Sequence, residues 1–332
     1  MKQTTKRIVW LVAFLGINTI GQCTEPFAKG TYLGQIPPGS TAQVFAPGLI
    51  SDTRPQVWES HGTFSADGNT FCYLRCSVRH SPRVGGIFIT ENTNQGWTAP
   101  KLIESIRENV PSVWSPCLSL DANSIYFARG LPASKRNLYR CDRTPHGWAV
   151  PQVLGPPLSS PATEWGLSIA ANNSCYLCSH RPGGFGGSDI WHAPFINNTW
   201  SEAIHIPALN TRYSDGAPGI APDESFLVFN SVRPGGLGGA DLYLSLRQSD
   251  GGITSVDLQH SLNFSLSNSA TSLGDNPMGC KKLMQVAALR LFDQVYFSTP
   301  CRNCDFELKN GSGFRLQGLI AGASYVDLEI LL

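Results

Sequence analysis

Three tryptophans set a regular spacing through the middle of the chain. Trp97, Trp148 and Trp200 lie 51 and 52 residues apart and open the phrases WTAPKLI, WAVPQVL and WSEAIHI. A step of 52 residues back from Trp97 reaches Phe45, which opens FAPGLIS, and 53 residues forward from Trp200 lies Ile253. A fixed period of this length indicates a repeat architecture, in which each unit buries its apolar surface against its neighbours.

Two further phrases keep the same spacing. The first combines a turn with an apolar strand: FSADGNTFCYLR, LSLDANSIYFAR, IAANNSCYLCS and IAPDESFLVFNS, with Asp67, Asp121 and Asp223 at the turns. The second is glycine-rich, and reads SHRPGGFGGSDIWHA from Ser179 and SVRPGGLGGADLYLS from Ser231. One unit is therefore strand, Asp turn, strand, glycine-rich hairpin loop, strand, polar turn, strand, which is the content of a propeller blade.

These phrases resemble the PD40, or WD40-like, repeats of the TolB-type β-propellers, over about residues 33–258. The resemblance implies an all-β propeller of four-stranded antiparallel blades. The length after Phe45 predicts five blades, with six as the alternative. Phe45 opens a fourth-strand phrase with no blade before it, so we expect the N-terminal strand to close the last blade and remove a sheet edge. Residues 259–332 are expected to form an irregular last blade, or to reflect an altered reading frame.

The N-terminus has the features of a targeting signal. Lys2, Lys6 and Arg7 precede the apolar run IVWLVAFLGI, and small residues follow it. The run is too short to span a bilayer stably, so the sequence predicts a signal peptide over 1–22, a lead-in over 23–43 and one propeller domain over 44–332. The expected location is periplasmic or secreted. A signal anchor and a lipid attached to Cys23 are the alternatives.

The net charge and the cysteines limit which kinds of partner and metal site are expected. The formal net charge of +1 gives no electrostatic basis for binding nucleic acid or an anionic membrane surface. Of the ten cysteines, Cys175 and Cys178 have zinc-like spacing, as do Cys301 and Cys304. The first pair falls inside an apolar strand, where odd spacing points the two side chains to opposite faces. We therefore expect small core side chains, with one or two disulfide bridges among the ten cysteines as an open alternative, and no metal or cofactor.

The glycine-rich loops are interpreted as structural. They lack the Lys-Ser/Thr and the helix that a phosphate-binding loop requires, and an extended aromatic segment follows them instead. Glycines allow the positive φ of a hairpin loop. Asp189 and Asp241 are expected to cap the loops through backbone N–H groups, and Arg181 and Arg233 to pair with those aspartates or with neighbouring blades.

No catalytic or metal-ligating residue is assigned. The sequence contains neither H-E-x-x-H nor G-x-S-x-G, and the repeats leave no room for a separate hydrolase domain. The expected function is a monomeric, non-catalytic scaffold that binds a protein or glycan on its axial face. The alternative is a carbohydrate-active lyase or hydrolase with its site at the axial mouth.

Three segments precede inner strands and are the candidates for ligand contact: Glu164-Trp165, Glu59 with His61, and Arg212 to Asp215. Ordinary blade-to-blade hydrogen bonding is the simpler explanation of the same residues.

Overall fold

The computed structural model describes residues 33, 45–51, 57–77, 84–107, 113–130, 135–235, 240–247, 253–257, 305–309, 313–320 and 324–331. Their regular structure is β apart from one short helix, α1 (Glu104–Arg107). Most strands belong to four antiparallel sheets, which we number as blades 1 to 4 along the chain.

Each blade has four main strands that pair in sequence order from the inner to the outer edge. Blade 1 consists of β1 (Val57–Phe64), β2 (Thr70–Ser77), β3 (Val84–Thr93) and β5 (Lys101–Leu102). Blade 2 consists of β6 (Val113–Leu118), β7 (Ser124–Arg129), β8 (Asn137–Thr144) and β10 (Gln152–Val153). Blade 3 consists of β11 (Glu164–Ile169), β12 (Cys175–Ser179), β13 (Asp189–Ala193) and β16 (Ile204–His205). Blade 4 consists of β17 (Asp215–Ile220), β18 (Phe226–Ser231), β19 (Asp241–Arg247) and β20 (Ile253–Asp257).

The remaining strands are short additions or lie at the C-terminus. β4 (Gly96–Trp97) and β9 (Gly147–Trp148) extend the turns after β3 and β8, and β14 (Phe195–Ile196) pairs with β15 (Thr199–Trp200). β21 (Asp305–Lys309), β22 (Gly313–Ile320) and β23 (Ser324–Leu331) form a separate three-stranded antiparallel sheet.

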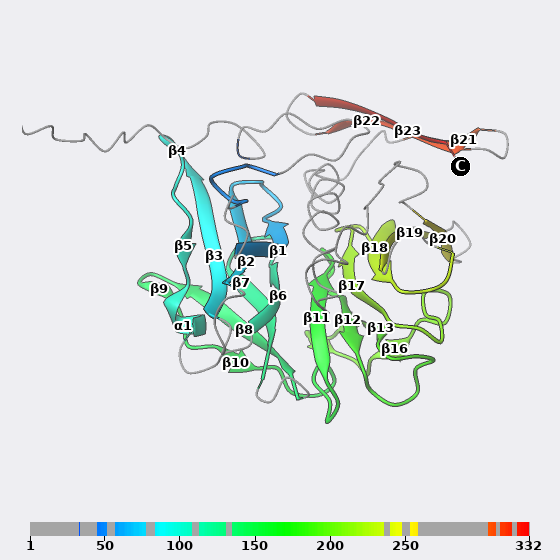
Figure 1. The fold of residues 1–332 in the computed structure, drawn as a ribbon, viewed down its shortest axis with the longest axis horizontal. Coiled ribbons are helices and arrows are strands. Elements are labelled where there is room, and N and C mark those ends of the chain that lie inside the picture. The colour runs from blue at the N-terminus through cyan, green and yellow to red at the C-terminus, as the bar shows by residue number, and fades with distance from the viewer. Residues whose placement is uncertain are drawn as a thin grey trace, which may run out of the picture.

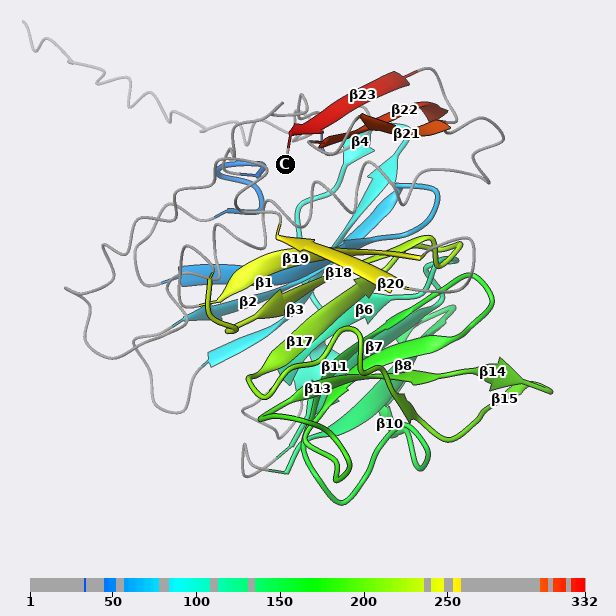
Figure 2. The same cartoon turned by 90° about the vertical axis from the view of Figure 1, so that its right-hand side faces the viewer.

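The four blades are arranged radially. The first strands β1, β6, β11 and β17 lie next to one another in that order, whereas β5, β10, β16 and β20 lie at the periphery (Figures 1 and 2). This confirms the predicted β-propeller of four-stranded antiparallel blades. The described residues hold four blades. A fifth or sixth blade stays a prediction, because residues 258–304 lie outside the described part of the chain.

Every inner strand carries a β-bulge. The register shifts between Ser60 and Thr63 in β1, and at the corresponding points of β6, β11 and β17. In blade 2 the bulge gives Ser115 a φ of 48°, and this residue packs against Gly166 of blade 3. A Cβ on Gly166 would lie 2.5 Å from that of Ser115, so the close approach of the two inner strands requires glycine.

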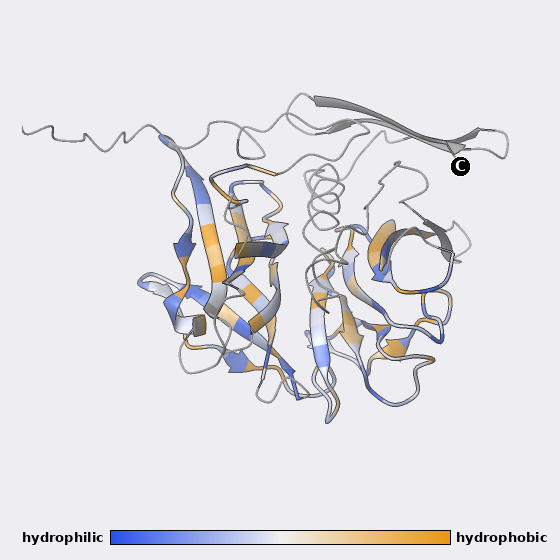
Figure 3. Cartoon of the chain, in the orientation of Figure 1, coloured by the Kyte–Doolittle hydropathy of each residue, from blue (hydrophilic) through white to orange (hydrophobic). Residues whose placement is uncertain are grey.

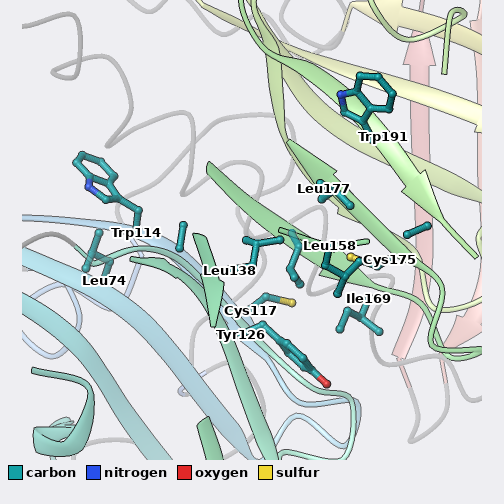
Figure 4. Packing of buried hydrophobic residues seen from close by; sticks show 13 residues of the cluster. Leu74, Trp114, Cys117, Tyr126, Leu138, Leu158, Ile169, Cys175, Leu177 and Trp191 are labelled. Atoms are coloured by element: carbon teal, nitrogen blue, oxygen red, sulfur yellow. The ribbon is translucent and has the colours of Figure 1, made fainter. Parts of the chain in front are cut away.

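The hydrophobic core lies between blades. One cluster joins blades 1 and 2, another joins blades 3 and 4, and the largest joins blades 2 and 3. Figure 4 shows this largest cluster, with Cys117 and Tyr126 of blade 2 beside Ile169 and Cys175 of blade 3. Apolar residues accordingly occupy the central parts of the strands in Figure 3. The repeated tryptophans contribute to these interfaces, since Trp148 packs on the first cluster and Trp200 on the largest.

The Phe45 segment differs from the predicted closing strand. Gly48 has a φ of 83°, Pro47 forms only an isolated bridge with Ser51, and the segment turns back on itself. Pro has no backbone N–H, and the left-handed glycine after it interrupts an extended chain. Phe45 instead packs against Phe64 of blade 1. Residues 45–51 are therefore not the extended strand that was expected, and they cover the face of blade 1 that points away from blade 2, its outward face. Pairing with a last blade stays a prediction, because that blade lies outside the described residues.

The predicted signal peptide lies outside the described residues, as does most of the lead-in. Leu33 is described, and it is buried in the same cluster as Phe45. Within the described part of the chain, no helix is long and apolar enough to cross a membrane.

Candidate functional site

Two kinds of connection define two ends of the propeller. The loops between second and third strands meet the linkers between blades, as when Glu164 N–H donates to the carbonyl of Arg136 at 3.0 Å. We call this end the loop face. The turns between first and second strands meet at the other end, where Ala66 N–H donates to Leu120 O at 2.9 Å. We call that end the turn face.

On the loop face an arginine holds the linker that enters blade 3. Arg181 donates to Pro157 O at 3.0 Å and to Leu158 O at 2.7 Å, and it pairs with the buried carboxylate of Glu164 at 3.6 Å. Glu164 also accepts hydrogen bonds from the backbone and hydroxyl of Ser160. The predicted loop residue Arg181 therefore pairs with the acid that opens the inner strand of its own blade rather than with Asp189.

Blade 4 repeats this arrangement. Arg233 donates to Leu209 O at 2.6 Å and to Asp215 Oδ1 at 2.7 Å, and Thr211 donates to the other oxygen of Asp215 through its backbone and hydroxyl. In blade 1, Arg75 contacts the carbonyl of Ile50. In each of the four described blades an arginine stacks on the third-strand aromatic: Arg75 on Phe88, Arg129 on Tyr139, Arg181 on Trp191 and Arg233 on Tyr243.

The glycine-rich loop of blade 3 is shaped by contact with the next linker. Asp189 accepts the Gly186 N–H at 3.2 Å, as expected of a capping aspartate. A Cβ on Gly186 would lie 2.1 Å from the carbonyl oxygen of Tyr213, and one on Gly187 would meet Ser214. These glycines are therefore required by close backbone approach. Asp241, the matching residue of blade 4, is buried at the start of β19, and the loop before it lies outside the described residues.

Blade 2 departs from the repeat on the loop face. Val113 takes the place of the acid that opens β11 and β17, and Arg136 projects from the loop before β8. The Arg136 guanidinium lies between two rings, 5.2 Å from the centre of Trp114 and 4.2 Å from that of Trp165. Both tryptophans come from inner strands. A buried cation between two aromatic faces is a strong interaction, worth about 2 kcal/mol or more when desolvated.

Trp165 also contacts the glycine-rich loop of its own blade. Its indole N–H donates to Nε2 of the exposed His180 at 2.9 Å, with the rings 5.7 Å apart. Accepting this bond requires a neutral imidazole. Burial and the nearby Arg136 charge lower the pKa of His180 from its usual value, while Asp189 opposes the shift. At neutral pH the hydrogen-bond geometry and the surrounding charges therefore both favour the neutral form of the His180 imidazole.

Acidification is expected to break this contact. Below the ordinary histidine pKa of ~6.5, protonation of His180 removes the acceptor of the Trp165 N–H and places a charge beside Arg136. Because the folded pKa is lowered, the stabilisation is full above the unfolded value and is lost as the pH falls through the window beneath it. Tryptophan emission followed from pH 7.5 to 4.5 should show a transition that His180→Gln lacks. An identical transition in that variant would contradict the assignment.

A second aromatic group lies further along the same face. Phe185, exposed at 56%, packs edge-on against His205, whose Nε2 lies 3.5 Å from Asp189 Oδ1. In the neighbouring linker Arg212 donates to the hydroxyl of Tyr213 at 2.8 Å. Contact of Gly186 with the Tyr213 carbonyl brings the loop and the linker together.

Two of the three segments that the sequence nominated, those around Trp165 and Arg212, thus contact the same blade 3 loop, one through His180 and the other through Gly186. Glu59 of the third segment is buried in blade 1 and lies 3.3 Å from Arg75. Sequence reasoning missed Arg136 and gave His180 no part in a site. The available signal was the loop LPASKR of blade 2, which lacks the paired glycines of blades 3 and 4.

Neither thiols nor carboxylates form a metal site in the described residues, where no group of three or more His, Cys, Asp or Glu side chains has suitable geometry. Five described cysteines are buried free thiols: Cys72, Cys117, Cys141, Cys175 and Cys178. Burial raises the pKa of the Cys117 thiol to about 12, so it remains protonated in the core. The Cys301 and Cys304 pair lies outside the described residues.

Neither a protein-family model nor a curated protein sequence matches the chain. Solved structures that match include TolB from Acinetobacter baumannii, at 13% identity over 60% of this chain and 43% of that one, with a TM-score of 0.39. A TolB-type protein from Agrobacterium tumefaciens matches at 13% identity over 82% and 81%, with a TM-score of 0.39. A puromycin-hydrolyzing peptidase from Mycobacterium tuberculosis matches at 14% identity over 62% and 29%, with a TM-score of 0.39.

The chain thus spans less than half the length of the first and the third of these proteins. TolB-type proteins are thus among the structures that this chain resembles, as the sequence expected, and the propeller fold itself is defined by the four radially arranged sheets.

Proposed function

We propose that the chain is an exported, non-catalytic β-propeller that binds a protein or glycan on the loop face of blades 2 and 3. The observation that supports the proposal is the departure of blade 2 from the repeat pattern. Blades 1, 3 and 4 share an arginine and acid pair that serves the fold, whereas blade 2 replaces the acid and inserts Arg136 between two tryptophans. Departures from an otherwise consistent pattern are expected at functional sites.

Export is proposed on the sequence of the N-terminus, with its basic residues followed by an apolar run. The periplasm or the exterior of the cell is the corresponding location. A folded repeat scaffold with aromatic and basic residues on its loop face suits a binding role there, since aromatic side chains and arginine supply most of the binding energy in recognition sites.

A carbohydrate lyase or hydrolase is the second candidate, and Glu164 is the observation that favours it. Burial raises the pKa of this carboxyl, despite bonds from Ser160 and the Arg181 charge, which is a property of general acids. Glu164 is, however, fully buried and surrounded by the hydroxyls and arginine that it serves. A group with no exposed surface is placed to support the loop face rather than to touch a substrate.

Loss of the Trp165 ring is expected to weaken ligand binding about 10-fold or more, as for a central recognition residue. The test uses the full mature chain on an array of defined glycans and peptides, comparing Trp165→Ala with Trp148→Ala. Trp148 is the matched control, because Arg143 stacks on it at 4.8 Å but it lies on the turn face. Binding lost only in Trp148→Ala would contradict the proposal. Turnover of an array glycan that Glu164→Gln abolishes would favour the enzyme.

A further inference from the structure

We infer that the loop face of blades 2 to 4 binds an acidic glycan, a chain of sugars that carry carboxylates. This inference rests on the proposed function and names the ligand class of that site. Three observations carry it: the charge of the loops, the exposed rings among them, and the saturation of their backbone N–H groups.

Exposed acidic side chains are concentrated at one end of the propeller. Apart from the exposed Glu104 of α1, in the linker that enters blade 2, the described loops and linkers of the loop face in blades 2 to 4 contain no Asp or Glu. Basic residues of the loops and of the two later linkers are Lys135, Arg136, His180, Arg181, Arg212 and Arg233. Acids that open the neighbouring strands are buried, with Glu164 and Asp215 at 0% exposure. The turn face instead exposes Asp67, Asp121 and Asp223. Such a distribution steers an anionic ligand to the loop face.

The exposed cations are few and widely spaced along the chain. Arg181 and Arg233 are committed to Glu164 and Asp215, which leaves Lys135 and Arg212 as the exposed lysine and arginine of the described loops. A nucleic acid presents a phosphate at every residue and needs many such contacts. A glycan with carboxylates at intervals matches two separated cations better.

Flat rings are interleaved with these cations. Phe185 is exposed at 56%, and Trp165 and Tyr213 are half-buried. Phe185 belongs to the blade 3 loop, which contacts Trp165 through His180 and the Tyr213 linker through Gly186. Aromatic rings with a polar edge present large, rigid contact areas at little entropic cost. The apolar C–H face of a pyranose is the matching surface on a sugar.

Many backbone donors of this face are already used, which argues against an extended peptide. Peptides that add to a protein edge gain affinity through main-chain hydrogen bonds. Here many N–H groups of the loops bond within the protein: those of Ser160, Ala162, His180, Arg181, Gly186, Thr211, Tyr213 and Arg233. The available contacts are therefore side-chain rings and charges, which suit a sugar chain.

Calorimetric titration with a hyaluronan oligosaccharide, in which every second sugar carries a carboxylate, tests the inference. Its carboxyl-reduced neutral form, poly-L-glutamate and oligothymidylate are the comparison probes. The expected result is preferential binding of the uronate chain, weakened about 10-fold or more by Trp165→Ala and by Lys135→Gln/Arg212→Gln, and unchanged in Trp148→Ala. Raised salt should weaken the wild type more than the double variant, because only exposed charges are screened. Thermal unfolding of each variant checks that it remains folded.

The other outcomes distinguish a failure of the acidic-glycan inference from a failure of the proposed binding function. Equal binding of the neutral and acidic sugars, dependent on Trp165, would overturn the acidic class and leave the binding function standing. Tighter binding of poly-L-glutamate or oligothymidylate, or equal binding of all polyanions, would overturn the glycan assignment. If no probe shows binding that depends on Trp165, both the inference and the proposed face are overturned.

Discussion

Replacing Asp215 with alanine is expected to lower the free energy of unfolding by ~3–5 kcal/mol, the cost of breaking a buried ion pair by removing one partner. Asp215 is fully buried, and it accepts hydrogen bonds from Thr211 N at 2.7 Å and from Arg233 at 2.7 Å. Its loss leaves the largely buried Arg233 guanidinium without its counter-charge and frees the linker into β17. Equilibrium urea denaturation at pH 7 measures the change.

Asp223→Ala is the matched control for this variant. Asp223 is an exposed turn residue that accepts the Ser225 N–H at 3.0 Å, so its removal should cost about 1 kcal/mol or less. Removing both members of the buried pair, in Asp215→Leu with Arg233→Met, should recover part of the loss, because an apolar pair leaves no buried charge. Equal losses in Asp215→Ala and Asp223→Ala would show that the buried pair does not hold the linker.

The repeat units were predictable because each has a local chemical cause. Asp121 accepts bonds from the Ser119 hydroxyl and the Asn123 N–H, which stabilise its turn and lower the pKa of the carboxyl. A short polar side chain in a turn shows this role in sequence alone. Glycine pairs before an alternating aromatic strand predict hairpin loops in the same way. These local signals explain why the strands of four blades were predicted correctly.

The partners of the loop arginines were not predictable, because they depend on tertiary contacts. Asp189 is close to Arg181 in sequence, whereas the actual partners are Glu164 on the inner strand and the carbonyl of Leu158 in the linker. The stacking of Arg136 between Trp114 and Trp165 likewise joins three elements of two blades. A periodic pattern identifies positions that are equivalent in successive blades. It cannot predict a site whose residues occupy different positions in their blades.

Replacing Phe45 with alanine is expected to cost ~3–5 kcal/mol, as for other buried phenylalanines. Phe45 is 1% exposed and packs 5.6 Å from the ring centre of Phe71 and 6.2 Å from that of Phe64. The segment is also held by Arg75, which donates to the carbonyl of Ile50 at 2.9 Å. Removing the ring therefore exposes the outward face of blade 1. Urea denaturation at pH 7 measures the loss.

Phe185→Ala, which removes an exposed ring of the same size, should change stability by about 0.5 kcal/mol or less. A small loss in Phe45→Ala as well would mean that residues 45–51 lie on blade 1 without stabilising it. A large loss confined to Phe45→Ala would show that blade 1 depends on a segment before its first strand. That dependence explains why the 52-residue spacing begins at Phe45: Ile50 covers one side of blade 1, and Ile103 packs in the next interface.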